Sequence, residues 1–166
     1  MICPSKKIFN LYCYRVAGAV GLISLKIFGD YNKKTRSFGL YLANALQITN
    51  ILRDVKQDKA MGRMYIPKEI LNKFKIKNKN INLIFNNKNF PNACKELSKY
   101  ADKNFVLAEK KLKICSKENL KSAVLMMNTY KLLLKKIKKN GWKNLDEKVS
   151  LNNFEKIFLF IKGIIC

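Results

Sequence analysis

The chain has 166 residues, of which 48% are hydrophobic, and this predicts one folded domain, residues 1–166, with its own core. It carries 34 Lys and Arg against 11 Asp and Glu, which gives a formal net charge of +23. It contains no His, which excludes His-based acid–base catalysis, His-containing zinc sites and Ser-His triads.

A charge this large is compatible with a protein that binds nucleic acid or an anionic membrane surface. The excess is mostly Lys, accompanied by abundant Asn and Ile, as AT-rich codon usage would produce. Arg, the better reader of phosphates and base edges, is scarce. We therefore expect no nucleic-acid partner.

The cysteines and apolar stretches bear on the compartment. None of the five Cys belongs to a Cys-x-x-Cys pair, which predicts reduced thiols in a cytoplasmic chain. The uncharged stretch 16–25 is too short to span a bilayer, and we find no signal peptide. Residues 157–161 and 164–165 are apolar but are separated by Lys162. They favour a buried helix or a peripheral membrane contact over a span.

The first three predicted elements are helices. Residues 11–28 are apolar with few charges, so we expect a helix that is buried on most sides. Residues 37–58 form a second long helix. Gly62 and Pro67 then interrupt the chain, and residues 68–71 begin a short helix.

The remaining elements are predicted to be helical as well. Residues 72–92 are rich in Asn and Lys, which indicates a loop with a short apolar anchor. One amphipathic helix runs from 91 to about 114 and another from about 119 to 139, where Asn140-Gly141 ends it. A last helix begins near 151, capped by Ser150, and runs to the end. No strand pattern appears, so the fold class is all-α.

Four polar residues mark the second long helix. Gln47, Asn50, Asp54 and Asp58 are spaced three, four and four apart, which places them on one stripe of a helix. Carboxylate and amide oxygens suit Mg²⁺, which binds a few carboxylates together with waters and substrate phosphates. A bare Asp-x-x-x-Asp, however, is more often a solvated helix face.

Two segments carry a longer resemblance. Residues 47–67 resemble the second aspartate-rich motif of the squalene/phytoene synthase family, Gln-x-Thr-Asn-Ile-Leu-Arg-Asp-x-x-x-Asp followed by Gly-Arg-x-Tyr-x-Pro. Residues 12–21 resemble the family's Tyr-Cys-x-x-Val-Ala-Gly-x-Val-Gly. A looser resemblance continues through Tyr130, Gly141, residues 149–151 and Lys156.

The resemblance implies an isoprenoid-synthase-type helical bundle and a transferase of isoprenoid biosynthesis, leading to carotenoids or hopanoids. Such enzymes join two prenyl diphosphates, farnesyl or geranylgeranyl, head to head. The implied cofactor is Mg²⁺, or Mn²⁺ in its place, with NADPH only if squalene is the product. The implied substrates are the prenyl diphosphates themselves.

The resemblance also implies roles for individual residues. Asp54 and Asp58 match the metal-binding carboxylates, and Arg53, Arg63 and Tyr65 match catalytic positions near the diphosphate and the reaction centre. The matched substrate-binding positions are Tyr12, Val16, Ala17, Val20, Gln47 and Asn50. Alternatively, Arg53 and Arg63 pair with the two aspartates at the surface, and Tyr65 caps the turn before Pro67.

The chain departs from the family pattern in one respect. The family has two facing aspartate-rich motifs, whereas this chain has one, and Asp30, Asp102 and Asp146 stand alone. It therefore resembles the C-terminal part of a synthase, without the N-terminal helices. We expect weak or no turnover from this chain alone, and uncovered apolar faces that imply a missing half or a protein partner.

Two other functions remain open. One is a non-catalytic synthase-like protein that acts in the assembly of a respiratory complex, against which the presence of both Asp54 and Asp58 counts. The other is a basic protein of nucleic-acid or membrane surfaces, which rests on the charge alone.

Overall fold

The computed structural model describes residues 1–28, 30–115, 118–142, 149–155 and 157–158, and within them the regular secondary structure is helical apart from one isolated β-bridge between Ile2 and Met64. The prediction of an all-α fold is confirmed. The elements in chain order are α1 (Lys6–Cys13), the π-helix η1 (Tyr14–Gly18), α2 (Ala19–Ile27), α3 (Lys33–Arg53), α4 (Val55–Ala60), α5 (Lys68–Lys73), α6 (Ile81–Phe85), α7 (Phe90–Leu112), the 3₁₀ turn η2 (Glu118–Leu120) and α8 (Lys121–Asn140).

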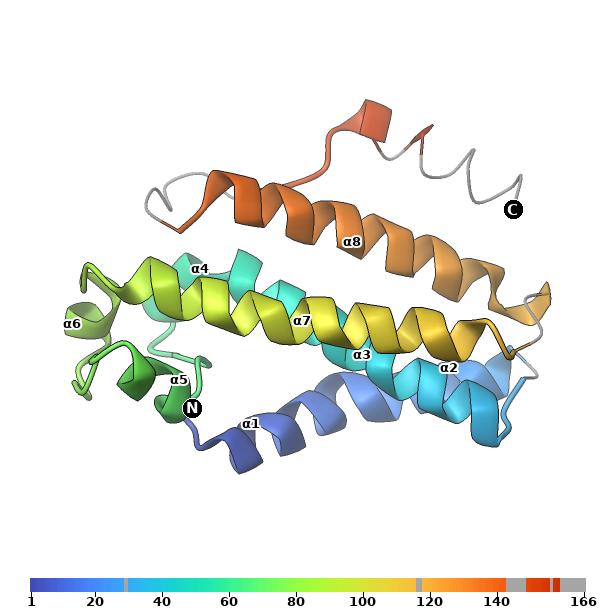
Figure 1. Cartoon of the computed structure of the whole chain (residues 1–166), viewed down its shortest axis with the longest axis horizontal. Coiled ribbons are helices and arrows are strands. Elements are labelled where there is room, and N and C mark those ends of the chain that lie inside the picture. The colour runs from blue at the N-terminus through green and yellow to red at the C-terminus, as the bar shows by residue number, and fades with distance from the viewer. Residues whose placement is uncertain (29, 116–117, 143–148, 156, 159–166) are drawn as a thin grey trace.

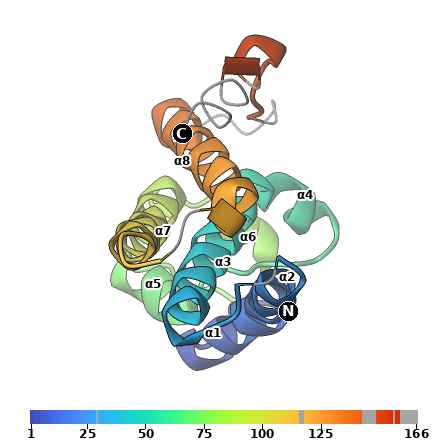
Figure 2. The ribbon, with the colours of Figure 1, turned by 90° about the vertical axis from the view of Figure 1, so that its right-hand side faces the viewer.

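Helix α3 is the central element of the bundle. It packs against α7, α8 and the α1–η1–α2 helix, as the two perpendicular views show (Figures 1 and 2). Its N-terminus begins at a capping box, in which the Asn32 side chain accepts from the Thr35 amide and the Thr35 hydroxyl accepts from the Asn32 amide. This reciprocal cap explains why the helix starts before residue 37, where we expected it.

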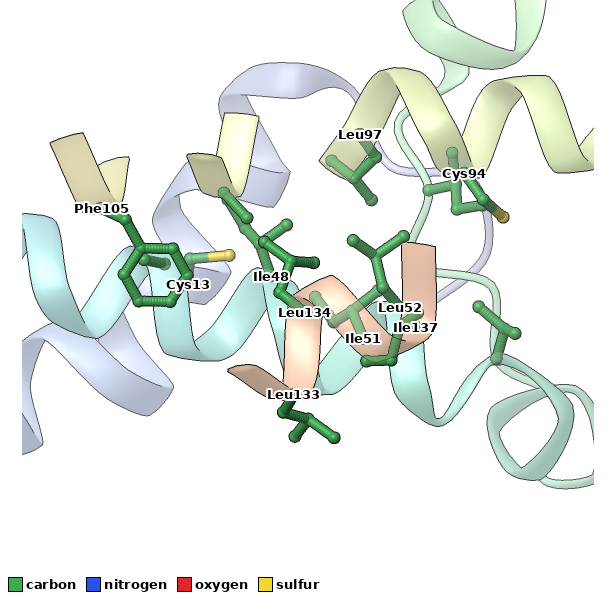
Figure 3. Close-up of a cluster of buried hydrophobic side chains, with 14 of the residues drawn as sticks. Cys13, Ile48, Ile51, Leu52, Cys94, Leu97, Phe105, Leu133, Leu134 and Ile137 are labelled. Atoms are coloured by element: carbon green, nitrogen blue, oxygen red, sulfur yellow. The ribbon is translucent and has the colours of Figure 1, made fainter. Parts of the chain in front are cut away.

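The core lies where α3, α7 and α8 meet (Figure 3). Helix α7 turns the expected apolar stripe inward, and its Ala93, Ala101 and Ala108 are fully buried. Small side chains at this spacing let α7 approach α3 closely. Ile48 and Leu52 of α3 and Leu134 of α8 fill the space between the three helices.

The α1, η1 and α2 elements form one continuous helix, which starts at Ser5, whose hydroxyl accepts from the Ile8 amide at 3.3 Å. The expectation that this helix is buried on most sides is wrong, because only one side of it packs against α3, through residues such as Phe9, Cys13 and Leu25. The opposite side is exposed.

The continuous helix also corrects the expectation drawn from the uncharged stretch 16–25. By length and composition alone, the 22 residues Lys6–Ile27 could cross a membrane, because the helix extends well beyond that stretch in both directions. Core helices of soluble proteins meet the same criteria, so this property does not assign a location.

Three further details differ from the predicted elements. The second long helix bends at Asp54, so α3 and α4 are separate. The expected loop 72–92 contains α6, whose Ile84 is fully buried as the apolar anchor. The last helix is capped by Asn152 instead of Ser150, through reciprocal 2.8 Å hydrogen bonds between Asn152 and Glu155. Residues 156 and 159–166 of that predicted helix, and Asp146, lie outside the described residues.

Helices α2 and α3 approach each other at Gly21, and this contact predicts a stability effect. A Cβ at Gly21 would lie 3.3 Å from the Ala43 Cβ and 3.4 Å from the Gly39 carbonyl oxygen, which cannot move without moving α3. We expect Gly21→Val to lower the free energy of unfolding by about 1–3 kcal/mol, measured by urea denaturation. Ile23→Val, on the exposed side of the same helix, should change it by less than about 0.5 kcal/mol. Equal effects of the two substitutions would contradict this packing.

Candidate functional site

A polar pocket of about 610 Å³ lies where α3 passes into α4. It is lined by Tyr12, Gln47, Asn50, Ile51, Asp54, Gln57, Asp58, Ala60, Met61, Arg63 and Tyr65. Seven of these residues are among those that the sequence motifs single out: Tyr12, Gln47, Asn50, Asp54, Asp58, Arg63 and Tyr65. Segments that are far apart in the chain therefore meet in one hollow.

The bend at Asp54 does not break the polar stripe. The Asp54 amide donates to the Asn50 carbonyl at 2.9 Å, and the Asp58 amide donates to the Asp54 carbonyl at 2.8 Å. The hydrogen-bonding interval of an α-helix thus continues through the bend. As a result, Gln47, Asn50, Asp54 and Asp58 all face the same pocket.

Trp142 supports the end of α3 from the other side of the bundle. Its indole Nε1 donates to the Leu52 carbonyl oxygen at 3.0 Å, two residues before Asp54, and the side chain is 5% exposed. Sequence reasoning missed this residue. The only available signal was that the chain's single Trp follows a helix stop, and its partner lies 90 positions away.

The loop after α4 brings Arg63 and Tyr65 to the pocket. Gly62 has φ +67°, a conformation that favours glycine, and the next amide, that of Arg63, donates to the Asp58 carbonyl at 2.7 Å. The N-terminal segment holds the loop further along. The Met64 amide donates to the Met1 carbonyl at 3.0 Å, and the Cys3 amide donates to the Met64 carbonyl at 2.8 Å.

Two tyrosines from different segments form one wall of the pocket. The rings of Tyr12 and Tyr65 stack with their centroids 4.8 Å apart and their planes 20° from parallel. Burial, the neighbouring Tyr65 and the charge of Asp58 raise the pKa of Tyr12, so the Tyr12 phenol remains a neutral donor at physiological pH.

Arg53 and Arg63 take different positions. The guanidinium of Arg53 binds Asp54 through both oxygens, at 2.9 Å from Nε and 2.6 Å from the second nitrogen. Arg53 is not among the residues that line the polar pocket, so the structure shows the ion pair that we gave as the alternative to a diphosphate contact. Arg63 lines the pocket, and its charge acts to lower the pKa of Asp58.

The carboxylates and Asn50 make the pocket a candidate cation site. Burial and the charge of Asp54 raise the pKa of Asp58, and Arg63 offsets only part of this shift. The Asn50 Oδ1 atom is buried without a hydrogen-bond donor. Carboxylate and amide oxygens of this kind suit Mg²⁺. In the described part of the chain no three His, Cys, Asp or Glu side chains come together as metal ligands, so the pocket offers two carboxylates.

An apolar pocket of about 290 Å³ adjoins the polar one between α2, α3 and α8. Val16, Ala17 and Val20, which the family resemblance points to as substrate positions, line it from the α1–η1–α2 helix. Residues that sequence reasoning did not assign to the site line the rest: Gly21, Ser24, Leu25, Phe28, Phe38, Gly39, Leu42, Ala43, Leu46, Ser122, Ala123, Met126 and Tyr130. Gln47 and Asn50 line both pockets, so the two hollows meet at this pair.

Comparison with known proteins places the chain in a family. The profile of "Squalene/phytoene synthase" matches residues 4–155. The presqualene diphosphate synthase of Zymomonas mobilis is 32% identical over 162 residues, which cover 98% of this chain and 55% of that protein. The presqualene diphosphate synthase of Sinorhizobium fredii is 31% identical over 153 residues, 92% of this chain and 55% of the relative.

Solved structures agree on the fold. A dehydrosqualene synthase superimposes with a TM-score of 0.77 at 23% identity, covering 99% of this chain and 58% of that one. YisP from Bacillus subtilis gives a TM-score of 0.77 at 20% identity, covering 95% and 64%. The chain thus spans about half the length of the curated relatives that it matches, and its helical fold is of the isoprenoid-synthase type.

The proximity of Asp54 and Asp58 predicts a gain of stability when one charge is removed. Like charges at this spacing on a helix cost about 0.2–0.5 kcal/mol, and we expect Asp58→Asn to raise the free energy of unfolding of the metal-free protein at pH 7 by about that amount. Because the folded-state pKa of Asp58 is raised, its ionised form penalises folding above that pKa. Below the pKa range of an ordinary aspartate, the Asp58 carboxyl is neutral in both the folded and the unfolded protein. The difference in stability between Asp58→Asn and the unsubstituted protein should therefore vanish there.

Asp102→Asn is the matched control for this change. Asp102 forms an exposed ion pair with Lys138 at 2.7 Å, so its replacement should cost between zero and about 1 kcal/mol. Urea denaturation at pH 3, 5 and 7 measures both variants. A loss of stability in Asp58→Asn at pH 7 would contradict the repulsion between the carboxylates.

Proposed function

Because the chain belongs to the squalene/phytoene synthase family, we propose that it binds a prenyl diphosphate and serves the head-to-head condensation of two such molecules. The proposed substrates are farnesyl or geranylgeranyl diphosphate. The observation that carries the proposal is the junction of a polar and an apolar pocket at Gln47 and Asn50. A prenyl diphosphate has the matching form, with a multiply charged anionic head and a hydrocarbon tail.

The polar pocket provides the groups that a diphosphate head requires. Asp54, Asp58 and Asn50 would hold Mg²⁺, which when bound neutralises the charge that develops on a diphosphate leaving group. Arg63 lines the same pocket, and its guanidinium can donate hydrogen bonds directly to a phosphate oxygen. Arg53 acts indirectly in this proposal: it does not contact the diphosphate, but its ion pair holds the Asp54 carboxylate in place.

The neighbouring groups suit an allylic cation. The stacked rings of Tyr12 and Tyr65 line the polar pocket, and aromatic π-faces stabilise positive charge. Val16, Ala17 and Val20 give the apolar pocket a wall without nucleophilic atoms. Excluding water from such a wall protects a carbocation from hydrolysis.

Ligand binding tests the proposal directly. We expect the chain to bind farnesyl thiodiphosphate, a slowly reacting analogue, in 5 mM MgCl₂, and at least about tenfold more weakly after removal of Mg²⁺ with EDTA. Asp58→Asn should weaken the Mg²⁺-dependent affinity about tenfold or more, because one of two carboxylate ligands is lost. Isothermal titration calorimetry measures each affinity.

Two controls distinguish the contribution of the diphosphate head to the affinity from that of the prenyl tail. Asp102→Asn, on the exposed surface, should leave the affinity unchanged. Inorganic diphosphate with Mg²⁺ should bind more weakly than the farnesyl analogue, since it cannot fill the apolar pocket. Equal affinities for the two ligands, or an affinity that does not depend on Mg²⁺, would refute the assignment of the polar pocket to the diphosphate and of the apolar pocket to the prenyl chain.

The small number of carboxylates available to bind a metal ion predicts poor catalysis by the chain alone. The described residues supply two carboxylates to the polar pocket, and the chain matches 55% of the Zymomonas mobilis relative. We therefore expect little or no conversion of farnesyl or geranylgeranyl diphosphate to a head-to-head product in the presence of Mg²⁺. Gas chromatography of the extracted products measures this, and turnover at the rate of a full-length synthase run in parallel would contradict it.

A further inference from the structure

The bend at Asp54 falls in the middle of the polar stripe. Helix α3 ends at Arg53 and α4 begins at Val55, and between them Asp54 has φ −102° and ψ +13°, outside the range of a regular α-helix. Bends of this kind arise at Pro, at Gly and Ser, at π-turns, or where another group inserts into the ladder of backbone hydrogen bonds. Residues 50–58 contain no Pro, Gly or Ser, and all of them are described without a π-turn, which leaves an inserted group as the cause.

Trp142 supplies the inserted group. In a regular helix the Leu52 carbonyl oxygen would accept from the amide four positions further on, in the first turn of α4. In this structure it accepts from the indole Nε1 of Trp142 at 3.0 Å. The Trp142 side chain is 5% exposed, so water hardly competes for this hydrogen bond. The indole therefore holds the last turn of α3 two residues before Asp54.

The end of α8 fixes the place of Trp142. Helix α8 packs against α3 and stops at Gly141, whose φ of +70° is a conformation that favours glycine. The Gly141 amide donates to the Ile137 carbonyl at 2.9 Å, and Ile137 itself is buried in the core. The turn thus brings the indole to α3 from a helix that is already anchored there.

Helix α4 has little buried surface of its own that would set its direction. It has six residues, of which Val55 alone is buried. Nevertheless it carries Asp58, whereas Asn50 lies on α3 and Asp54 lies at the bend. The position of Asp58 relative to the other two oxygen-bearing side chains is consequently set by the bend.

We propose that Trp142 is a positioning residue of the polar pocket. By binding the Leu52 carbonyl, its indole N–H fixes the bend at Asp54 and keeps Asp58 facing the same pocket as Asn50. Groups that orient the ligands of a metal ion without touching the ion typically change its affinity about 10–100-fold. This role rests on the proposed function, but the bend is a property of the ligand-free chain and can be tested without a ligand.

The substitution Trp142→Phe keeps an aromatic ring and removes the donor. We expect it to weaken the affinity for farnesyl thiodiphosphate in 5 mM MgCl₂ about tenfold and to leave the affinity in EDTA unchanged, because only the Mg²⁺-dependent part requires the bend. Phe105→Leu, at a buried position of α7 well apart from Leu52 in Figure 3, is the control for lost packing and should change neither affinity. Isothermal titration calorimetry measures each affinity. Equal weakening by the two substitutions, or no weakening by Trp142→Phe, would overturn the proposal.

Two tryptophan analogues separate the hydrogen bond from the shape of the ring, and they keep the test open if Trp142→Phe does not fold. The chain has one Trp, so an analogue supplied to a tryptophan-auxotrophic host replaces this side chain alone. In 3-benzothienylalanine a sulfur atom replaces the indole N–H, whereas 5-fluorotryptophan keeps the N–H. The sulfur analogue should lower the Mg²⁺-dependent affinity, and the fluorinated analogue should retain it. Equal Mg²⁺-dependent affinities of the two proteins would contradict a role of the N–H.

Hydrogen exchange tests the bend in the ligand-free protein. Trp142→Phe should make the amides of residues 55–60 exchange about fivefold faster, the effect of losing one hydrogen bond, with a smaller change in residues 90–112. Phe105→Leu should not produce this selective change. Mass spectrometry of peptic fragments measures the exchange, and unchanged exchange of residues 55–60 in Trp142→Phe would overturn the inference. If the unsubstituted chain binds no farnesyl analogue, the proposed function fails, and the exchange rates still decide whether Trp142 fixes the bend.

Discussion

Helix α3 has to be a core helix and a ligand-presenting helix at the same time, and the other elements are arranged around that constraint. Ile48 and Leu52 are almost fully buried, yet Gln47 and Asn50 lie beside them on the pocket side. The period of 3.6 residues lets one helix do both, because the two sets fall on different faces. Even its buried Thr49 is satisfied locally, by donating to the Ala45 carbonyl at 2.7 Å.

Elements encoded by short-range patterns were predictable. The polar stripe, the apolar face of α7 and the helix stop at Gly141, where φ is +70°, each depend on residues within a few positions of one another. The all-α fold and the residues that gather at the polar pocket followed from these patterns and from the family resemblance. In each case the information lies in the local sequence.

Features that depend on distant partners were not predictable. The support of α3 by Trp142 and the stacking of Tyr12 on Tyr65 join segments tens of residues apart. The prediction that residues 11–28 are buried was wrong for a related reason. An apolar composition shows that burial of a helix is favourable, but it does not show whether other parts of the chain cover that helix. The Arg53–Asp54 pair was among the alternatives, but choosing it required the direction of the side chain.

The hydrogen bonds of the first residues have a mechanical consequence. Met64 is held on both sides by Met1 and Cys3, and the Lys68 amide donates to the Pro4 carbonyl at 2.9 Å, directly before α1 begins. The loop that carries Arg63 and Tyr65 is therefore tied to the base of the Lys6–Ile27 helix, which has one exposed side. A shift of α1 would move one wall of the polar pocket with it. Any contact made by the exposed side of that helix and occupancy of the pocket would then be thermodynamically linked, each altering the affinity of the other by the same factor.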